Sequence, residues 1–396
     1  MFLQILCILF LFPAIIVTMY YMILAIYALI FKKKKMSMML NQKHTFAIVI
    51  PAHNEESVIS NTLLSCAKLD YPKDKYKVIV IADNCSDRTS EIATKHEAVC
   101  LERFDNIHRG KGYALAWAFD RILPEGHDAV IVLDADCQID THALRVFDQH
   151  LTDGKKVLQA NVASSNPDDT TMSYAVSVGN VIENDLFYAP KSQLGLAVFL
   201  RGTGMVFRQD VLLSHPWKAH SIVEDLEFSL NLMRNGVRVT YVGDVKVKTN
   251  FPPYKHQLNT QRIRWASGTL GFGKTQALKL IWGGVVKRSC LLVDAGWTFL
   301  VLSRPLVLLE LFIAVILAIV CLQLWPGLLS KWLLRIGLVL ILMQGLYFGI
   351  GIFFLGINLR RIKLLLGTPV LVIRLMVISL LGIIGVNIDN WVRTPR

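Results

Sequence analysis

Three short polar segments carry residue types that can bind a phosphate or a cation, and each directly follows an apolar stretch. They are Pro51–Glu55, Asp83–Asp87 and Asp134–Asp136. Asp134 and Asp136 are two carboxylates one residue apart, which share one side of an extended segment. Such oxygen ligands suit Mg²⁺ or Mn²⁺, and an ion of this kind usually keeps a substrate phosphate in its coordination shell. The alternative is a simple strand-end turn, a position that Asp favours.

Two further segments carry residues that could bind the base and the diphosphate of a nucleotide. Asp83 could accept a hydrogen bond from a base N–H, although an Asp here could also cap the helix expected at 89–95. Arg109-Gly110-Lys111-Gly112 opens another expected helix. Its glycines allow close approach of the backbone, and its cations suit a diphosphate. A solvated basic turn is the alternative for this segment.

Two candidate groups lie further along the chain. Glu224-Asp225 precedes a helical pattern, where a carboxylate could act as a general base or merely complement the helix dipole. Gln261, Arg264 and Trp265 share one helical face, at positions i, i+3 and i+4. An amide, a cation and a flat ring suit a phosphate beside a sugar, whereas the alternative is an amphipathic helix at a membrane surface.

The elements that must position these residues alternate between strands and helices. We expect strands at 45–51, 76–83 and 128–134, and helices at 55–68, 89–95 and 110–123. Strands separated by helices predict a parallel sheet with crossovers. Ligands of such sheets bind beyond the carboxyl ends of the strands. The three polar segments are therefore expected to converge on one crevice.

The composition places part of the chain in a membrane. Hydrophobic residues make up 53% of the 396 residues and charged residues only 18%, against roughly a quarter in soluble domains. Residues 1–31 carry no charge and are long enough to span a bilayer. Lys32–Lys35 follow at once, which predicts an uncleaved anchor whose C-terminal end lies in the cytosol.

More apolar stretches follow the middle region. Residues 311–330 and 336–359 predict a hairpin of two spans, with a turn at 326–335. The stretch 364–388 contains Arg374, and a charge near the middle of a span is costly. We therefore expect an interfacial or re-entrant helix there, with a cytosolic C-terminus.

These features divide the chain into five parts. They are an anchor at 1–31, a cytosolic catalytic domain at 44–250, interfacial helices at 251–304, a transmembrane hairpin at 305–359 and an interfacial or re-entrant helix at 360–396.

Charge and cysteine content exclude two other classes of protein. The formal net charge is +12, but the region 44–304 is nearly neutral and the basic residues lie beside apolar runs. Basic residues beside apolar runs are typical of a membrane protein, in which they set the orientation of the spans. A nucleic-acid-binding protein would instead carry a basic stripe on its globular domain. The seven cysteines are scattered without metal-binding spacing, which predicts reduced thiols.

One motif supports a competing class. Residues 268–275 match the phosphate-loop pattern GxxxxGK[ST], which would suit an ATPase or a transporter. A phosphate loop must follow a buried strand, and the preceding residues QRIRWAS form no such strand. A non-catalytic scaffold is a third class, but it has no need of Asp134, Asp136 and Asp225 together.

Taken in order, the motifs resemble the membrane-bound family of inverting glycosyltransferases that includes cellulose, chitin and hyaluronan synthases and ceramide glucosyltransferase. The resemblance covers roughly residues 45–270. It rests on VIPAHNEE at 49–56, the Asp83 turn, Lys111, Asp134-x-Asp136, Arg201-Gly202-Thr203-Gly204, Glu224-Asp225 and Gln261-x-x-Arg264-Trp265.

The resemblance implies a fold and a role for each matching residue. The fold is a GT-A-type, Rossmann-like mixed α/β sheet with transmembrane and interfacial helices at both ends. The donor, a UDP-sugar, is held by Ala52, His53, Glu55, Asp83, Lys111 and Asp134. The metal, Mg²⁺ or Mn²⁺, is bound by Asp136 with Asp134. The acceptor and the diphosphate contact Gly202, Thr203, Gly204, Gln261, Arg264 and Trp265. Asp225, beside Glu224, is the catalytic base.

The resemblance also implies a product and a location. The leading expectation is an integral membrane enzyme, with a cytosolic catalytic domain at the plasma membrane, that extends a β-linked cell-surface glycan. The runner-up transfers a single sugar to a membrane lipid, as ceramide glucosyltransferase-like enzymes do. Polysaccharide synthases of this family often have more spans than the three expected here. The acceptor is thus a glycan or a lipid, and a homo-oligomer or an export partner stays open.

Overall fold

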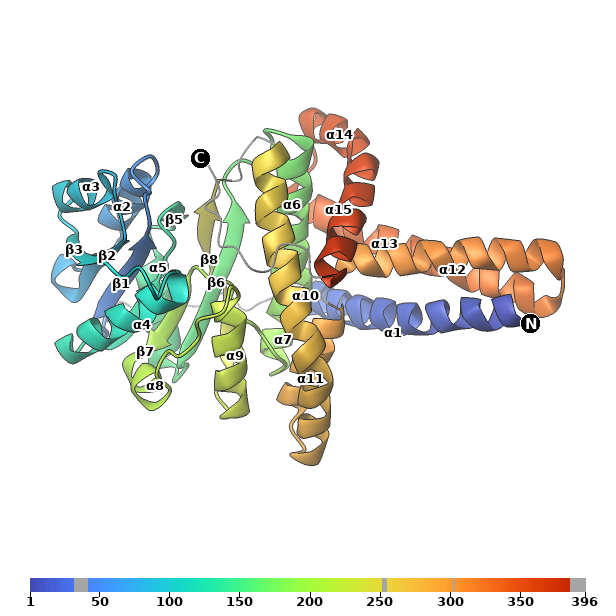
Figure 1. Cartoon of the computed structure of the whole chain (residues 1–396), viewed down its shortest axis with the longest axis horizontal. Coiled ribbons are helices and arrows are strands. Elements are labelled where there is room, and N and C mark those ends of the chain that lie inside the picture. The colour runs from blue at the N-terminus through green and yellow to red at the C-terminus, as the bar shows by residue number, and fades with distance from the viewer. Residues whose placement is uncertain (32–41, 251–254, 302, 385–396) are drawn as a thin grey trace.

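An eight-stranded mixed sheet forms the centre of the catalytic region (Figure 1). The computed structural model describes residues 1–31, 42–250, 255–301 and 303–384, and the side chains of 255–267, 270 and 381–384 are not described. The strands are β1 Phe46–Ala52, β2 Tyr76–Asp83, β3 Val99–Arg103, β4 Ala129–Val132, β5 Cys137–Ile139, β6 Val157–Ser164, β7 Met205–Arg208 and β8 Val239–Thr249. The mixed α/β fold implied by the resemblance is confirmed.

The strand order explains how distant segments meet at one edge of the sheet. The order is β3-β2-β1-β4-β7-β6-β8-β5. Strands β3, β2, β1 and β4 are parallel, but β7 is antiparallel to β4 and β6, and β5 is antiparallel to β8. The parallel pairing expected of the strands at 45–51, 76–83 and 128–134 is confirmed, and the antiparallel pairs lie in the second half of the mixed sheet. The carboxyl ends of β1, β2, β4 and β8 meet the beginnings of β5 and β7 at the same edge.

Helices cover both faces of the sheet. The helices of the catalytic region are α2 Ile59–Ala67, α3 Thr89–Lys95, α4 Lys111–Ile122, α5 Ala143–Thr152, α6 Thr171–Val181, α7 Ala189–Gln193, α8 Gln209–Ser214 and α9 Glu224–Arg234, with short 3₁₀ turns η1 Lys73–Lys75 and η2 Leu123–Glu125. Helices α2, α3 and α5 share one apolar cluster with the strands, and α4 and α9 share another. A π-helix, η3 Ile182–Tyr188, continues α6.

Three long apolar helices extend away from the sheet, side by side in Figure 1. They are α1 Phe2–Ile30, α12 Arg304–Leu324 and α13 Leu328–Leu355, and each is long and apolar enough to cross a membrane. A shared apolar core joins them, and a Cβ built at Gly337 of α13 would lie 2.7 Å from Val315 of α12. The predicted turn at 326–335 is shorter in the structure, because α13 begins at Leu328 and includes Lys331 and Arg335.

Four other helices lie across the direction of the three long ones (Figure 1). They are α10 Lys255–Val286, α11 Cys290–Val301, α14 Leu359–Leu366 and α15 Thr368–Ile384. Helices α14 and α15 would together be long enough for a fourth span but are bent by 52° at their junction. This bend fits the expected interfacial or re-entrant segment, which stays a prediction. The residues 385–396 at its end lie outside the described part of the chain.

A buried polar contact joins the catalytic region to the apolar helices α1 and α11. Lys191 of α7 is fully buried, and its Nζ lies 3.0 Å from Asp294 Oδ2 of α11. Asp294 also accepts hydrogen bonds from the Tyr20 hydroxyl of α1 at 2.6 Å and from the Ala197 N–H at 2.8 Å. One carboxylate therefore links α1, α7, α11 and the segment that leads to β7.

Candidate active site

Lys111 lies at the centre of the converging segments. It begins α4, and its Nζ donates to Asp134 Oδ1 at 2.5 Å and to the Gly202 carbonyl at 2.6 Å. Glu224 Oε1 lies 3.8 Å from the same nitrogen. Burial alone would lower the pKa of Lys111, but the nearby carboxylates, Asp134 foremost, raise it above its ordinary value. Lys111 therefore stays a cation that neutralises a cluster of acids.

Glu224 and Asp225 begin α9 and face the same cation. Burial raises the pKa of both carboxyls, while the charge of Lys111 opposes that rise. Gly202 adopts a φ of +75°, and a Cβ built there would lie 3.5 Å from both Asp225 Oδ2 and Lys111 Nζ. A carboxyl with a raised pKa beside the Gly202 backbone is suited to accept a proton from a bound hydroxyl.

The pair Asp134 and Asp136 follows β4 and leads into β5. Their carboxylate oxygens and the Cys137 sulfur lie within 4.8 Å of one another. Thr249, at the end of β8, donates to Asp136 Oδ2 at 3.1 Å. Burial raises the pKa of the Cys137 thiol well above its ordinary value, so the sulfur stays protonated. The donor set is therefore two hard carboxylates, which fits Mg²⁺ or Mn²⁺ better than a thiolate-seeking metal.

Asp83 ends β2 and is held by a buried arginine. Arg103 of β3 is 4% exposed and donates to Asp83 Oδ1 at 2.6 Å. Burial raises the pKa of Asp83, and the Arg103 contact opposes that rise. Asp83 does not cap α3, because Asp87 Oδ1 accepts from the Thr89 N–H at 3.0 Å. Arg103 was not among the residues predicted from the sequence, since the strand that carries it was not expected.

The turn after β1 is fixed to the turn after β2. His53 Nδ1 lies 2.6 Å from the Asp83 carbonyl oxygen, and the Asn54 side chain accepts from the Ser86 N–H at 2.7 Å. The Glu55 N–H donates to Thr89 Oγ1 at 2.8 Å. The structure thus brings Ala52, His53 and Glu55 together with Asp83 at one sheet edge, as the strand pattern predicts.

Gly202, Thr203 and Gly204 form a tight segment between this edge and β7. Thr203 Oγ1 accepts from the Asp134 N–H at 3.0 Å, and the Gly204 N–H donates to the Val132 carbonyl at 2.9 Å. Gly204 has a φ of +64°, and a Cβ built there would lie 2.9 Å from Ala160 and Val247. The segment therefore lies directly against Asp134.

Gln261, Arg264 and Trp265 lie in α10, so their backbone is helical as predicted, but their side chains fall outside the described part of the structure. Gly268 of the same helix lies against Val223, the residue before Glu224, which places α10 next to α9. The match to GxxxxGK[ST] at 268–275 also lies inside α10. A continuous helix cannot form a phosphate loop. Residues 268–275 therefore provide no nucleotide-binding site for the ATPase alternative.

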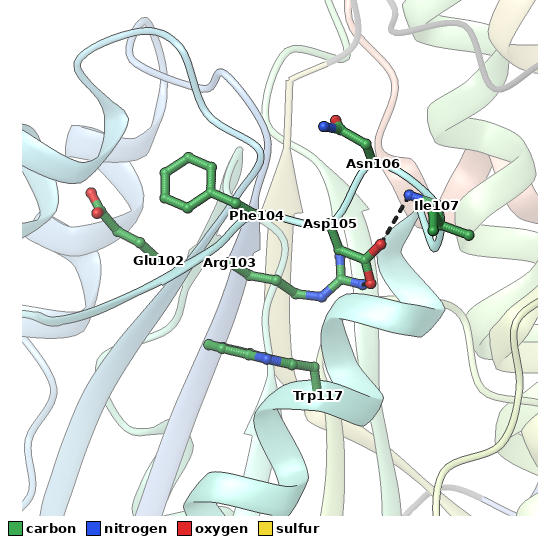
Figure 2. A pocket seen from close by; sticks show the side chains of 7 residues that line it. All are labelled: Glu102, Arg103, Phe104, Asp105, Asn106, Ile107 and Trp117. Carbon is green, nitrogen blue, oxygen red and sulfur yellow. Dashed lines mark hydrogen bonds and ion pairs between the residues drawn. The ribbon is translucent and has the colours of Figure 1, made fainter.

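A surface depression of about 580 Å³ adjoins the Asp83 side of this region (Figure 2). Residues Glu102–Ile107 and Trp117 line it. The loop is held by Asp105, which accepts from Arg103 Nη2 at 2.9 Å and from the Ile107 N–H at 2.9 Å. The depression lies at the sheet border and does not include Lys111, Asp134 or Asp225.

Comparisons with known proteins agree with this geometry. The family model described as "Glycosyltransferase like family 2" matches residues 23–268. A β-monoglucosyldiacylglycerol synthase of Trichormus variabilis is 28% identical over 236 residues, which cover 56% of this chain and 48% of that protein. Glucomannan 4-β-mannosyltransferase 1 of Cyamopsis tetragonoloba is 24% identical over 249 residues, covering 59% and 47%. The chain spans about half the length of the curated relatives it matches.

A solved structure shares the fold over nearly the whole chain. It is a mannosyltransferase from Pyrobaculum calidifontis, in complex with GDP-Man and Mn²⁺. The TM-score is 0.62 at 16% identity, with 96% of this chain and 99% of that chain covered. At this identity the likeness concerns the fold alone. The family match extends over more than half of the chain and contains the residues gathered around Lys111, so the protein belongs to glycosyltransferase family 2 and is a glycosyltransferase.

Proposed function

We propose that this protein transfers a sugar, with inversion, from a nucleotide sugar to an acceptor carried by the membrane. The observation that carries the proposal is the contact of Lys111 with Asp134 and Gly202, next to Asp225. A potential base and an acidic pair that could hold a metal would then lie within reach of one substrate. Family membership supplies the reaction class.

The donor is proposed to be a UDP-sugar lying across the sheet edge. Asp83, kept in place by Arg103, would accept from the base, and Ala52, His53 and Glu55 would enclose the nucleoside. Lys111 would turn from Asp134 toward the diphosphate. Asp134 and Asp136 would hold Mg²⁺ or Mn²⁺, which when bound offsets the negative charge that builds on the leaving diphosphate. Gln261, Arg264 and Trp265 are proposed to hold the diphosphate and the acceptor.

Asp225 is proposed as the base. It would take the proton of the acceptor hydroxyl while the oxygen attacks the anomeric carbon from the face opposite the diphosphate. A single displacement turns an α-linked donor into a β-linked product. Glu224, with its raised pKa, and Lys111 would keep Asp225 oriented and its charge balanced.

The acceptor is proposed to be a lipid rather than a growing polymer. Helices α1, α12 and α13 pack on one another through a shared core, and Gln344 Nε2 of α13 donates to Thr18 Oγ1 of α1 at 3.0 Å. Three helices in such contact leave no passage for a sugar chain among the described spans. The predicted polymer product would require a channel from elsewhere, such as a second copy or an export partner.

The expected membrane arrangement accompanies this proposal. Lys32–Lys35 at the end of the α1 anchor would place the catalytic region at 44–250 in the cytosol, at the plasma membrane. The helices within 251–304 and 360–396 would lie at the membrane surface. Residues 305–359 would form a hairpin that crosses the membrane and returns to the cytosolic side. In that arrangement the candidate active site would reach the head groups of lipids in the cytosolic leaflet.

The test uses the full chain in phosphatidylcholine nanodiscs with Mn²⁺ or Mg²⁺. Nucleotide sugars are screened for release of nucleoside diphosphate with and without added lipid acceptors, and the products are sized. The proposal predicts turnover of a uridine-linked sugar that depends on a lipid and gives one sugar per lipid. A high-mass polymer would favour the synthase alternative. Release from no donor under any condition would contradict both.

A further inference from the structure

Three glycines lie close together in the middle of α10. They are Gly268, Gly271 and Gly273, and they belong to the 268–275 motif that forms no phosphate loop. Glycine is among the poorest helix formers, because it loses more backbone freedom on folding than any other residue. Their presence in a continuous helix therefore needs an explanation, which the surroundings of each glycine can supply.

The three glycines differ in what surrounds them. A Cβ built at Gly271 would meet nothing within 4 Å. A Cβ built at Gly273 would lie 3.1 Å from a ring carbon of Phe299 on α11, whereas one built at Gly268 would lie 2.8 Å from Val223 Cγ1. Gly268 therefore makes the closest approach of the three, and the residue that it approaches belongs to the catalytic region.

The approach at Gly268 leaves no room for a side chain. Carbon atoms in ordinary contact lie about 3.5 Å or more apart, so a methyl group at this position would have to be displaced from Val223 by about 0.7 Å. Val223 is 8% exposed and packs in the apolar cluster that contains residues of α4 and α9. Its side chain is branched at Cβ and therefore stiff. The strain would pass to the backbone of α10.

A second contact fixes the position of α10 along α9. Arg234, the last residue of α9, donates from its Nη2 to Gln276 Oε1 at 2.6 Å. Val223, at the other end of α9, is the residue against which Gly268 lies. Gly268 and Gln276 follow each other along α10 in the same order as Val223 and Arg234 do along the chain. The two helices therefore run in the same direction, and their register is set at both ends of α9.

This register places residues 261–265 (QRIRW) beyond the start of α9. The segment ends three residues before Gly268, which is about 4.5 Å along a helix axis. Asp225 lies in the first turn of α9, two residues after Val223. The backbone of α10 thus carries residues 261–265 to the end of α9 at which Asp225 lies. The distance between the two depends on how closely α10 approaches at Gly268.

We propose that Gly268 is a positioning residue that sets the spacing between residues 261–265 and Asp225. This inference rests on the proposed function, since that function assigns Arg264 to the leaving diphosphate and Asp225 to the attacking hydroxyl. The two groups must act in one displacement, from opposite faces of the anomeric carbon. A misplacement of about 1 Å can cost about 100-fold in rate. A methyl group at position 268 would widen the spacing and slow the transfer step.

The experiment compares four variants of the full chain with the wild type in nanodiscs with Mn²⁺. They are Gly268→Ala, Gly271→Ala, Val223→Ala and the double variant Gly268→Ala/Val223→Ala. Turnover is followed as release of nucleoside diphosphate, with kcat and donor KM determined separately, and the unfolding temperature of each variant is measured. Gly271→Ala is the matched control, because it makes the same substitution in the same helix at a position where a Cβ meets nothing within 4 Å.

The double variant gives the decisive comparison. Gly268→Ala should lower kcat at least about tenfold, whereas donor KM should change less, because the contacts proposed for the nucleoside lie at Asp83 and not on α10. Gly271→Ala should match the wild type. Val223→Ala removes the methyl groups that oppose a Cβ at position 268, so adding Gly268→Ala to it should lower kcat by less than about threefold. A change that merely weakened α10 would not be cancelled in this way.

Three results would overturn the inference. One is a kcat of Gly268→Ala close to that of the wild type. Another is an equal loss from Gly268→Ala with and without Val223→Ala, which would mean that the contact between these residues is not the cause. The third is a loss of folded protein in Gly268→Ala that Val223→Ala does not restore, since Gly268 would then serve folding rather than spacing. Failure of the wild type to release nucleoside diphosphate from any donor would instead contradict the proposed function, and this inference with it.

Discussion

Lys111 is the residue on which the electrostatics of the site depend. One ammonium group faces Asp134, Glu224 and Asp225, and their charges act on it together. Without a substrate these acids would repel one another, so the cation holds them in place. A divalent metal ion, which Asp134 and Asp136 could hold, would add positive charge beside these acids. The site is therefore organised before its substrates bind.

The raised pKa of Asp225 predicts the pH dependence of the reaction. Burial raises it, so this carboxyl takes up a proton at a higher pH than an exposed aspartate, whose pKa is about 3.9. A protonated Asp225 cannot act as a base. We expect kcat/KM to fall as the pH decreases, with the acid limb well above pH 4. A pH–rate profile at saturating metal measures this, and full activity down to pH 4 would contradict it.

Thr249 is expected to position the metal ligand Asp136. Its hydroxyl donates to Asp136 Oδ2, and hydrogen bonds to metal ligands typically affect metal affinity by 10- to 100-fold. Thr249→Val should raise the Mn²⁺ concentration for half-maximal activity about tenfold, with donor KM at saturating Mn²⁺ little changed. Thr240→Val, at the opposite end of β8, is the control. An unchanged Mn²⁺ requirement in Thr249→Val would disprove this role.

At the scale of elements, strand ends and helix starts bring the site together. Strand β5 pairs with β8 so that Cys137 lies opposite Thr249, and this register places Asp136 beside the end of β8. Helix α4 begins where its first residue, Lys111, reaches the end of β4. The site thus depends on where the elements begin and end more than on their length.

Gly112 allows α4 to begin at that place. A Cβ built at Gly112 would lie 2.3 Å from the Ala219 carbonyl oxygen, a backbone atom that cannot move aside cheaply. Gly112→Ala should therefore displace the start of α4 and Lys111 with it, and reduce activity at least tenfold. Gly179→Ala is the control, because a Cβ at this α6 position meets nothing within 4 Å. Equal activity of both variants would refute the argument.

Strands β1, β2 and β4 could be predicted from the sequence, whereas β3 and the second half of the sheet could not. Runs such as TFAIVIP and YKVIVIAD are nearly all apolar, so β1 and β2 were expected within one or two residues of their observed bounds. Strand β6 contains the buried polar residues Gln159 and Asn161, and its pattern resembles no simple strand. Gln159 Nε2 is paired with the Thr203 carbonyl at 2.9 Å, a partner visible only in the fold.

The residues of the candidate active site could likewise be predicted only where a local sequence pattern marks them. Asp134 and Asp136 were proposed from their recognisable spacing, and the structure brings their carboxylates close together. Arg103 and Thr249 were not, because each acts through a contact across the sheet that no local pattern encodes.

At the scale of the whole molecule, a buried ion pair joins the catalytic region to the apolar helix α11. Burial lowers the pKa of Lys191 to about 8, while its partner Asp294 opposes the change. Asp294 also accepts hydrogen bonds from the Tyr20 hydroxyl of α1 and from the Ala197 N–H. Removing the Asp294 carboxylate would therefore leave both of these donors without this acceptor. This contact fixes the position of α7 relative to α1 and α11.

Lys191→Met should destabilise the protein by about 3–5 kcal/mol, because it leaves the Asp294 charge buried without its partner. Adding Asp294→Asn should recover part of the loss, since the amide oxygen still accepts from Ala197. Lys77→Met breaks an exposed pair with Glu125 and should cost less than about 1 kcal/mol. Unfolding temperatures in detergent measure all three, and equal shifts for Lys191→Met and Lys77→Met would speak against the buried link.

The central claim is that Asp225 is the base of an inverting sugar transfer. It is tested most directly by comparing product formation and product anomer for the wild type, Asp225→Asn and the control Asp120→Asn, an exposed aspartate of α4. We predict a β-linked product from an α-linked donor. Asp225→Asn should lose at least about 100-fold in rate while still binding donor, and Asp120→Asn should match the wild type. An α-linked product, or near-normal turnover by Asp225→Asn, would contradict the account.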